Sequence, residues 1–376
     1  MARLRAAVIG LGRMGNTFDD EIRYEVARGG VFFLPYCHGP SYAASHQTDL
    51  VAGADPHEGQ RAEFGSRFGL ADSQLYADHR DMLAAKRIDI VSVCTSARYR
   101  AQIVQDCAEA GVKAIWAEKP IAFTLEEADA MVQSCADHGV VMAVNCSRRW
   151  HPLFHEAHKL MKAGDLGEML QVTGYGTCPL SSNGSHLIDT MCFLADSRVD
   201  WLFGELNETD AATADEDLQG NAYLAFANGL RGYMRGMNCG AASWDFEAIG
   251  TEGRIRSSTH GLDFELYRLV PGGIRGASLP VKYPYPWPVS IEGMGEIIIS
   301  DLLHCIETGD SPRCSGDDAR HALEVAFGIH ASHRSGGQRI NLPLDERSQR
   351  ILASESVHDH TPARFRRKAM FAQASR

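Results

Sequence analysis

Short apolar segments alternate with amphipathic segments over the first 145 residues. Apolar runs typical of buried strands lie at 6–10, 50–55, 88–93, 112–117 and 140–145. Helical periodicity appears around 60–68 and 101–110, and the capping-box pattern of 124–127 opens a helix to about His138. Strands that alternate with helices in this way predict a doubly wound, parallel α/β sheet.

The pattern changes in the second half of the chain. Residues 221–226 and 230–234 have the character of strands, and Asn228-Gly229 between them is a strong hairpin signal. Residues 244–249 and 254–257 flank a glycine-containing turn in the same way. These segments predict antiparallel pairing.

The bulk properties limit the class of protein. A chain of 376 residues is long enough for about two domains, and 44% hydrophobic with 23% charged residues is typical of globular proteins. No apolar run reaches the length of about 18 residues that a membrane helix needs. The start of the chain lacks a signal-peptide core, so we expect a cytoplasmic protein with no membrane partner.

Charge and cysteine content exclude further classes. A net charge of −11 argues against nucleic acid as a partner, because such binding depends on phosphate neutralisation by lysine and arginine. The ten cysteines are scattered, with neither a C-x-x-C pair nor metal-ligand spacing. We therefore expect reduced, mostly buried thiols and no metal site.

A glycine-rich turn follows the first predicted strand. Residues Gly10, Leu11, Gly12, Arg13, Met14 and Gly15 form the pattern G-x-G-x-x-G. In a dinucleotide site, Gly10 allows the tight turn, Gly12 lets the backbone approach a pyrophosphate, and Gly15 allows close packing of helix on strand. The position of this pattern after a strand predicts a nucleotide site, although glycine-rich turns after strands are common.

The second predicted strand ends in Asp55. A carboxylate there accepts hydrogen bonds from the ribose hydroxyls of NAD and repels the 2′-phosphate of NADP; NADP stays possible, and a turn aspartate before Pro56 is the alternative. Asp55 follows Gly15 by about 40 residues, where about 20 are usual. The surplus, an insertion at about 16–40, is either a lid over the ligand edge of the sheet or a surface excursion with its own small core.

Several motifs in a fixed order carry a resemblance to a known family. They are Glu118-Lys119-Pro120, Arg148-Arg149-Trp150-His151-Pro152, 162–168, Gly184-Ser185-His186-Leu187-Ile188-Asp189, 249–253, 315–319 and 341–344. Together with the glycine turn, they resemble the glucose–fructose oxidoreductase/inositol dehydrogenase (Gfo/Idh/MocA) family over roughly residues 4–345. Each motif alone is weakly specific, and their correct order makes the resemblance strong.

The resemblance implies a fold and an assembly. We expect an NAD(P)-binding Rossmann domain at 1–145 and an α+β domain at 146–354 with an open, mostly antiparallel sheet backed by helices. The tail at 355–376 lies past the usual end of the family and carries basic residues, as an oligomer arm or a terminal extension would. The exposed sheet face of the family implies a homodimer or homotetramer.

The resemblance also implies chemistry. It implies an NAD-dependent dehydrogenase that oxidises a secondary hydroxyl of a sugar, sugar derivative or cyclitol by hydride transfer. Lys119 and His186 match the catalytic lysine and histidine, and a histidine suits a general base because its ordinary pKa lies near neutrality. Asp189, one helical turn after His186, is expected to orient the imidazole or bind substrate.

The expected binding residues fall into two sets. The cofactor set is Gly10, Leu11, Gly12, Arg13, Met14, Gly15, Asp55, Thr95, Ser96, Glu118, Lys119 and Asn145. The substrate set is Lys119, Arg149, Trp150, Asn183 and His186, with a carbohydrate or cyclitol as the small-molecule partner.

Two positions depart from the family pattern. Many family dehydrogenases have an aspartate four residues before the histidine, where this chain has Ser182, and Arg100 replaces the usual histidine of the turn that begins at Thr95. Ser182 keeps open a redox-neutral glycosidase or lyase that uses NAD transiently. A non-catalytic ligand-binding protein on the same fold is the second alternative.

Overall fold

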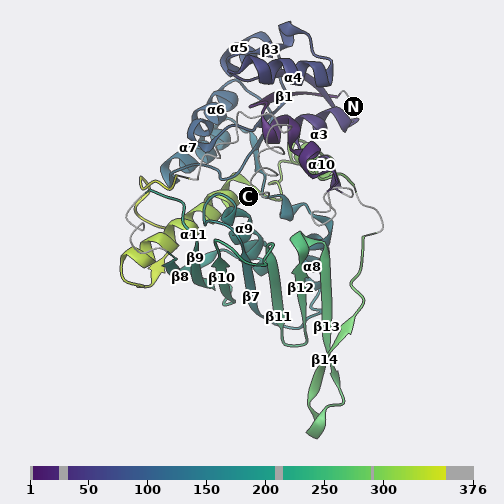
Figure 1. The fold of residues 1–376 in the computed structure, drawn as a ribbon, viewed down its shortest axis with the longest axis vertical. Coiled ribbons are helices and arrows are strands. Elements are labelled where there is room, and N and C mark those ends of the chain that lie inside the picture. The colour runs from purple at the N-terminus through teal and green to yellow at the C-terminus, as the bar shows by residue number, and fades with distance from the viewer. Residues whose placement is uncertain (1–2, 25–32, 208–214, 289–291, 353–376) are drawn as a thin grey trace, which may run out of the picture.

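Two β-sheets, each covered by helices, organise the chain (Figure 1). The computed structural model describes residues 3–24, 33–207, 215–288 and 292–352. The predicted tail at 355–376 lies outside the described residues. One sheet is parallel and the other mostly antiparallel, which confirms the predicted fold class.

The first sheet has the order β3-β2-β1-β4-β5-β6, and all its strand pairs are parallel. Its strands are β1 (Leu4–Ile9), β2 (Thr48–Ala54), β3 (Leu75–Tyr76), β4 (Ile90–Val93), β5 (Ala114–Ala117) and β6 (Val141–Val144). β4 and β5 are buried at every position, as expected for parallel strands covered on both faces. The five predicted strands are confirmed. β3 was missed because two residues carry no periodicity.

Helices cover both faces of this sheet. They are α3 (His38–Ala44), α4 (Glu58–Phe68), α5 (His79–Ala85), α6 (Ala97–Glu109) and α7 (Leu125–Asp137). Thr124 caps α7: its Oγ accepts from the Glu127 amide (3.0 Å), and the Glu127 carboxylate accepts from the Thr124 amide (3.3 Å). The predicted capping box is therefore present, and it fixes where α7 begins.

The chain returns to the first sheet at its end. α10 (Met294–Thr308) buries Met294, Ile298, Ile299 and Leu302 in the same core as Val8 and Trp116. The predicted boundary at 145/146 assigned these residues to the second domain. Their apolar face instead completes the core of the first one, which is a long-range contact that no local pattern encodes.

The second sheet has the order β14-β13-β12-β11-β7-β10-β9-β8-β15, antiparallel except for the parallel pair β10 and β7. Its strands are β7 (Met169–Gly176), β8 (Val199–Leu206), β9 (Gly220–Phe226), β10 (Arg231–Gly236), β11 (Asp245–Gly250), β12 (Gly253–Ser258), β13 (Asp263–Pro271), β14 (Ser278–Tyr283) and β15 (Ile340–Asn341). Both predicted hairpins are present.

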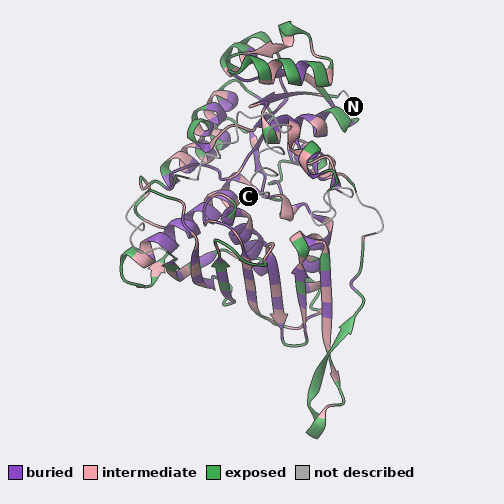
Figure 2. Cartoon of the chain, in the orientation of Figure 1, coloured by how far each residue is buried: buried purple, intermediate pink, exposed green. Residues whose placement is uncertain are grey.

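One face of the second sheet is covered and the other is open (Figure 2). α8 (Pro152–Lys162), α9 (Gly184–Ala195) and α11 (Gly316–Arg334) pack their apolar residues against the covered face. Leu170, Phe203 and Tyr233 are exposed on the strands themselves. The helix layer carries the start of α9 toward the first domain, where the site lies.

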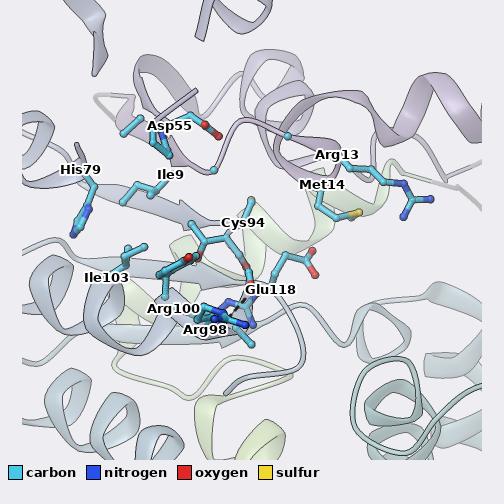
Figure 3. Close-up of a pocket in the computed structure, with 18 of the residues that line it drawn as sticks. Ile9, Arg13, Met14, Asp55, His79, Cys94, Arg98, Arg100, Ile103 and Glu118 are labelled. Atoms are coloured by element: carbon cyan, nitrogen blue, oxygen red, sulfur yellow. Dashed lines mark hydrogen bonds between the residues drawn. The ribbon is translucent and has the colours of Figure 1, made fainter. Parts of the chain in front are cut away.

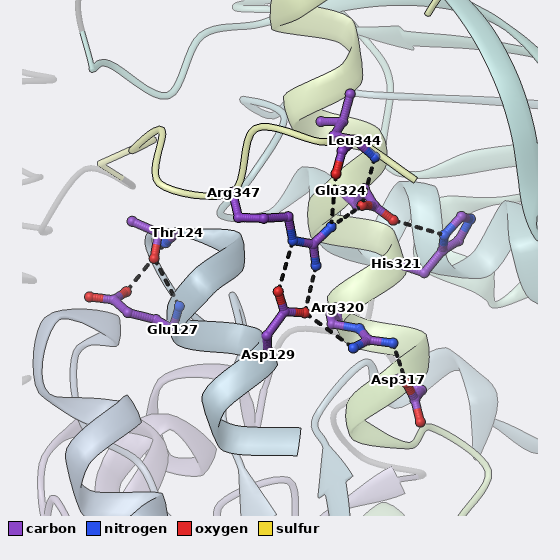
Figure 4. A network of polar contacts seen from close by, with 9 residues as sticks. All are labelled: Thr124, Glu127, Asp129, Asp317, Arg320, His321, Glu324, Leu344 and Arg347. Carbon is purple, nitrogen blue, oxygen red and sulfur yellow. Dashed lines mark hydrogen bonds and ion pairs between the residues drawn. The ribbon is translucent and has the colours of Figure 1, made fainter. Parts of the chain in front are cut away.

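An ion network joins the two helix layers (Figure 4). Asp129 of α7 accepts from the Arg320 guanidinium of α11 (3.1 Å) and from the Arg347 Nε (2.8 Å). Arg347 also pairs with Glu324 of α11. These contacts tie the first domain to the C-terminal segment.

The described ends of the insertion pack against both domains. The short helix α1 (Phe18–Ile22) holds Asp19, whose carboxylate accepts from the Tyr36 and Cys37 amides (both 3.0 Å). The ring of Phe33 lies 4.4 Å from that of His151. The described ends therefore contact the first domain and, through Phe33 and His151, the start of the second, and both expectations for the insertion stay open.

Candidate active site

A cavity of about 890 Å³ lies along the carboxyl edge of the first sheet (Figure 3). The turns after β1, β2, β4 and β5 line it, and Ser182 and Asn183 of the second domain close one end. The predicted residues that line it are Gly10, Gly12, Arg13, Met14, Asp55, Thr95, Ser96, Glu118, Lys119 and Asn183. Ligands bind at this edge in open α/β sheets.

The glycine turn has the geometry that its sequence requires. Gly10 has φ +87°, and a Cβ there would lie 2.9 Å from the Cys94 carbonyl carbon. A Cβ on Gly15 would lie 2.1 Å from the Gly10 carbonyl oxygen. Both positions therefore exclude a side chain. Leu11 points into the core and Gly15 packs beneath the turn, so neither lines the cavity.

Asp55 lies beside the glycine turn despite its long separation in sequence. β1 and β2 are adjacent, with Ile9 opposite Ala54. One Asp55 oxygen accepts from the Leu11 amide (2.8 Å) and the other from the His57 amide (2.9 Å). Asp55 thus has a turn role and also faces the cavity, so it fixes the shape and the charge of the end where a ribose would lie.

In the turn after β4, Arg100 stands where the family pattern has a histidine, and the polar contacts of the turn depend on it. Ser96 caps α6 by accepting from the Arg98 amide (3.4 Å). Arg100 is buried and donates to the carbonyl oxygens of Thr95 and Pro120, so its guanidinium ties the turns after β4 and β5 together. Burial lowers the pKa of Arg100 to about 10. The residue that replaces the usual histidine is therefore a structural bridge as well as part of the cavity wall.

A buried polar chain supports the end of β5. His38 Nε2 donates to Glu118 Oε1 (3.1 Å), and His38 Nδ1 lies 2.8 Å from Ser92 Oγ. Asn145 Nδ2 also donates to Glu118 Oε1 (2.6 Å). Burial alone would raise the pKa of Glu118, but these partners and Lys119 lower it to about 2. The carboxylate next to the lysine is therefore fixed and ionised.

Sequence reasoning missed His38 and Ser92. Ser92 was visible as the one hydroxyl inside the apolar strand 88–93. His38 belongs to the insertion, and nothing local to it indicates that α3 brings its ring within 3.6 Å of the Trp116 ring.

Lys119 and His186 lie at the domain junction, where the charge of Lys119 acts on the imidazole. Lys119 Nζ donates to Asn183 Oδ1 (2.8 Å). His186 lies in the first turn of α9, and its Nδ1 is buried without a hydrogen-bond partner among the described residues. Burial, with the charges of Lys119 and Arg148, holds the pKa of His186 well below its usual value, so the imidazole is neutral at neutral pH. Burial also lowers the pKa of Lys119.

A carboxylate that sequence reasoning missed holds the loop in front of α9. Asp217 accepts from the Ser181 amide (2.6 Å) and from the Ser182 amide (2.7 Å). Burial raises the pKa of Asp217, while these amides and the Lys119 charge act in the opposite direction. Asp217 precedes β9, so only the tertiary fold brings it to this loop.

Four of the predicted catalytic and substrate-binding residues do not line the cavity: Arg149, Trp150, His186 and Asp189. Arg149 Nε donates to both oxygens of Asp189 (2.9 and 3.0 Å), and Asp189 is fully buried. Trp150 is fully buried and donates to Asp301 (2.8 Å). The expected roles of Asp189 at the imidazole, and of Arg149 and Trp150 at substrate, are therefore corrected: a buried ion pair and a core contact occupy these side chains.

Asp189 also belongs to a buried group with two thiols. Its carboxylate and the sulfurs of Cys146 and Cys314 lie within 4.8 Å of one another. Arg149 already neutralises this carboxylate. The three residues lie far apart in the sequence, at 146, 189 and 314, so no local spacing predicts the group.

The lining fits a bound dinucleotide. Thr95 lines the cavity, and its Oγ1 is buried without a partner among the described residues. Asn145, which donates to the lining residue Glu118, has an Oδ1 that is unpartnered in the same sense. Orphaned polar atoms of this kind are satisfied by a ligand or by water. Together with the side-chain-free turn at Gly10, they match the demands of a nucleotide whose pyrophosphate approaches the backbone.

The chain matches two family models. Residues 4–146 match "Oxidoreductase family, NAD-binding Rossmann fold", and residues 173–256 match the "GFO/IDH/MocA C-terminal domain". Among the described residues, no helix has both the length and the apolar character needed to cross a membrane.

Curated relatives align over most of both chains. D-apiose dehydrogenase of Paraburkholderia graminis is 26% identical over 343 residues, which is 84% of this chain and 88% of the relative. The scyllo-inositol 2-dehydrogenase (NAD(+)) of Bacillus subtilis is 25% identical and covers 89% of this chain and 95% of its own.

Solved structures share the fold. An inositol dehydrogenase homolog of Azotobacter vinelandii, complexed with NADH and myo-inositol, has TM-score 0.70 and 19% identity over 90% of this chain and 97% of its own. A levoglucosan dehydrogenase, complexed with NADH and L-sorbose, has TM-score 0.71 and 22% identity over 91% of this chain and 100% of its own.

Proposed function

Since the chain belongs to the Gfo/Idh/MocA family of NAD-binding oxidoreductases, which act on carbohydrate or cyclitol hydroxyls, we propose a specific division of labour in its site. The protein is an NAD-dependent dehydrogenase that oxidises a secondary hydroxyl of a sugar, sugar derivative or cyclitol. Lys119 and His186 handle the proton, and Asn183 positions the substrate end of the site.

One observation carries this proposal. A single cavity contains both the glycine turn and the Lys119–Asn183 pair. A dinucleotide anchored at Gly10–Gly15 therefore extends toward the lysine. When bound, NAD supplies the acceptor for the hydride that leaves the carbinol carbon.

The residues at the junction divide the proton chemistry. His186 is neutral and has an unpartnered ring nitrogen, so it accepts the proton of the substrate hydroxyl. The Lys119 ammonium, oriented by Asn183, stabilises the negative charge that develops on the same oxygen or passes the proton on. The ionised Glu118 behind it favours the charged lysine.

Asp217 is a positioning residue in this scheme. It fixes the amides of Ser181 and Ser182 and so holds Asn183 where the lysine reaches it. Its charge also acts on Lys119. A carboxylate is thus present near the lysine although Ser182 brings none.

Ser182 favours one second candidate. The serine lines the cavity where many family dehydrogenases have an aspartate, which leaves room for a redox-neutral glycosidase or lyase that uses NAD transiently. Such an enzyme retains its cofactor through purification and forms product without net NADH.

The first experiment is nicotinamide absorbance with the purified protein, NAD or NADP, and a panel of sugars, cyclitols and sugar acids. Growth of NADH with one substrate class supports the dehydrogenase. Product formed from a glycoside without NADH, together with bound cofactor in the purified protein, contradicts it and favours the redox-neutral enzyme.

The assembly and location are finer proposals. The exposed Phe203 and Tyr233 on the open face of the second sheet suit a contact between copies of the chain. We propose a homodimer or homotetramer through this face, which sedimentation of the wild type and of Phe203→Asp tests. The cytoplasmic location stays a prediction.

A further inference from the structure

Two adjacent arginines have opposite surroundings. Arg149 binds Asp189 through both carboxylate oxygens and also pairs with Asp318 (3.4 Å). Arg148 has no ion pair and no side-chain hydrogen bond to any described residue, and its Nε is buried without a partner. The Arg148 guanidinium instead lies over the Trp244 ring, whose centroid is 5.4 Å from the guanidinium carbon.

Arg148 lies beside the reaction centre. Trp244 Nε1 donates to the Asn183 carbonyl oxygen (3.5 Å), and Asn183 Oδ1 accepts from Lys119. The Arg148 guanidinium is therefore connected to Lys119 through three contacts, by way of Trp244 and Asn183. The charges of Lys119 and Arg148 both act on His186, so the imidazole lies within the field of each.

The neighbouring carboxylates are already engaged. Glu118 is bonded to His38 and Asn145, Asp189 to Arg149, and Asp217 to two backbone amides. Ser182, on the cavity wall, brings no charge. Burial lowers the pKa of Arg148 to about 10, so it is still charged at neutral pH. The Arg148 guanidinium has a buried Nε and no counter-ion among the described residues, which is a costly arrangement. Its place on the Trp244 ring, with its charge acting on His186, indicates that a ligand supplies the anion.

We propose that the substrate is a polyhydroxy carboxylate, such as a uronate or an aldonate, whose carboxylate binds the Arg148 guanidinium. The planar fork of an arginine matches the two oxygens of a carboxylate. Trp244 offers an aromatic face beside it, suited to the apolar face of a sugar ring. The hydroxyl that reacts then lies at Lys119 and His186. This inference rests on the proposed dehydrogenase for its reaction, but not for its binding.

Matched pairs of compounds test the inference. The pairs are D-glucuronate with D-glucose, D-galacturonate with D-galactose, and D-gluconate with D-glucitol, with D-glucose 6-phosphate as a different anion. Initial rates of NADH formation give kcat and KM, and calorimetric titration of the enzyme–NADH complex gives binding without turnover. The proteins are the wild type, Arg148→Gln, Arg148→Lys, and Arg235→Gln, an exposed arginine on β10, as the control.

We expect the wild type to prefer an acid over its neutral partner by at least about 10-fold in kcat/KM, as a buried charge-assisted pair supplies. Arg148→Gln removes this preference, mainly through KM, and lowers kcat/KM for the acid by at least about 10-fold more than for the neutral sugar. Arg148→Lys restores part of it, and Arg235→Gln matches the wild type.

Three results overturn the inference. The first is an equal kcat/KM of the wild type for acids and for their neutral partners. The second is an equal loss of kcat/KM for both in Arg148→Gln. The third is a higher kcat/KM of the wild type for D-glucose 6-phosphate than for the carboxylates. If no compound yields NADH, the dehydrogenase proposal fails by itself. In that case, tighter binding of an acid than of its neutral partner, lost in Arg148→Gln, still supports carboxylate recognition, and no such difference overturns it.

Discussion

The two ends of the cavity are built in different ways. The cofactor end consists of consecutive strand ends and their turns, with Gly10, Gly12 and Asp55 placed by the order of the parallel sheet. The substrate end is assembled from segments far apart in sequence, so that Lys119 meets Asn183 across 64 residues. The first end depends on local backbone geometry, and the second depends on how two domains pack.

Charge separates the two ends as well. At the cofactor end, Asp55, Asp78 and Arg80 all line the cavity, so both signs of charge are present on its wall. At the other end, the charges of Lys119 and Arg148 both act on His186 and, with burial, hold its pKa well below the usual value. In the proposed scheme, recognition at the first end uses backbone amides and one carboxylate, whereas the chemistry at the second uses cations whose field is strengthened by burial.

Loss of the lysine is the largest expected effect and separates the two ends most cleanly. Lys119→Met removes the charge that stabilises the developing alkoxide, so we expect kcat to fall about 10³-fold. NAD affinity, measured by calorimetry, changes by less than about 3-fold because the glycine turn and Asp55 are untouched.

The matched control is Lys113→Met, at the opposite edge of the sheet. Lys113 pairs with Asp89 (2.9 Å) and is half exposed, so its loss leaves kcat within about 2-fold of wild type. A Lys119→Met enzyme that keeps its kcat but loses NAD would reverse the assignment of the two ends.

Loss of His186 has the second largest expected effect on kcat, and it also changes how kcat/KM depends on pH. The pKa of His186 lies well below 6.5, so the basic form persists as pH falls through 6 and is lost only at lower pH. The pKa of Lys119 is lowered from 10.5, so its ammonium is lost at a pH below that value. We expect a bell-shaped kcat/KM with these two limbs.

His186→Asn removes the acid limb and lowers kcat about 10²-fold. His304→Asn, an exposed histidine on α10, is the control and keeps both limbs. An unchanged acid limb in His186→Asn would assign the base to another group.

How far the sequence predicts each end follows from the same difference. The turn at 10–15 and the strand before Asp55 are local patterns, and the structure places them as expected even though the insertion doubles the usual spacing. Arg149 and Trp150, predicted at the substrate, bond instead to Asp189 and Asp301, which only the tertiary fold brings to this short turn. Only the packing of α9, α10 and α11 decides which of Arg148 and Arg149 is paired.

The glycine turn provides a test of the cofactor end alone. Gly15→Ala puts a Cβ 2.1 Å from the Gly10 carbonyl oxygen, so the turn must move. The turn must shift to relieve this contact, and a displaced binding turn raises the dissociation constant for NAD by about 10-fold or more. Gly59→Ala on α4 is the control, because a Cβ there meets nothing within 4 Å. Equal effects of the two variants on NAD binding would contradict the close packing of the turn.

The smallest expected effect concerns the choice between NAD and NADP. Asp55→Asn removes the negative charge at the ribose end but keeps an oxygen that accepts from the Leu11 amide. We expect the ratio of NADP to NAD affinity to rise about 10-fold, because repulsion of the 2′-phosphate is relieved while the glycine turn stays anchored.

Asp78→Asn is the matched control for this change. Asp78 lines the same end of the cavity and caps α5 through the Arg80 amide (2.8 Å), but it has no contact with the glycine turn in the described structure. If Asp78→Asn shifts the ratio as much as Asp55→Asn does, the general field of this end selects the cofactor. If Asp55→Asn lowers the affinity for both nucleotides equally, the carboxylate acts by fixing the turn, and its charge has no part in the choice.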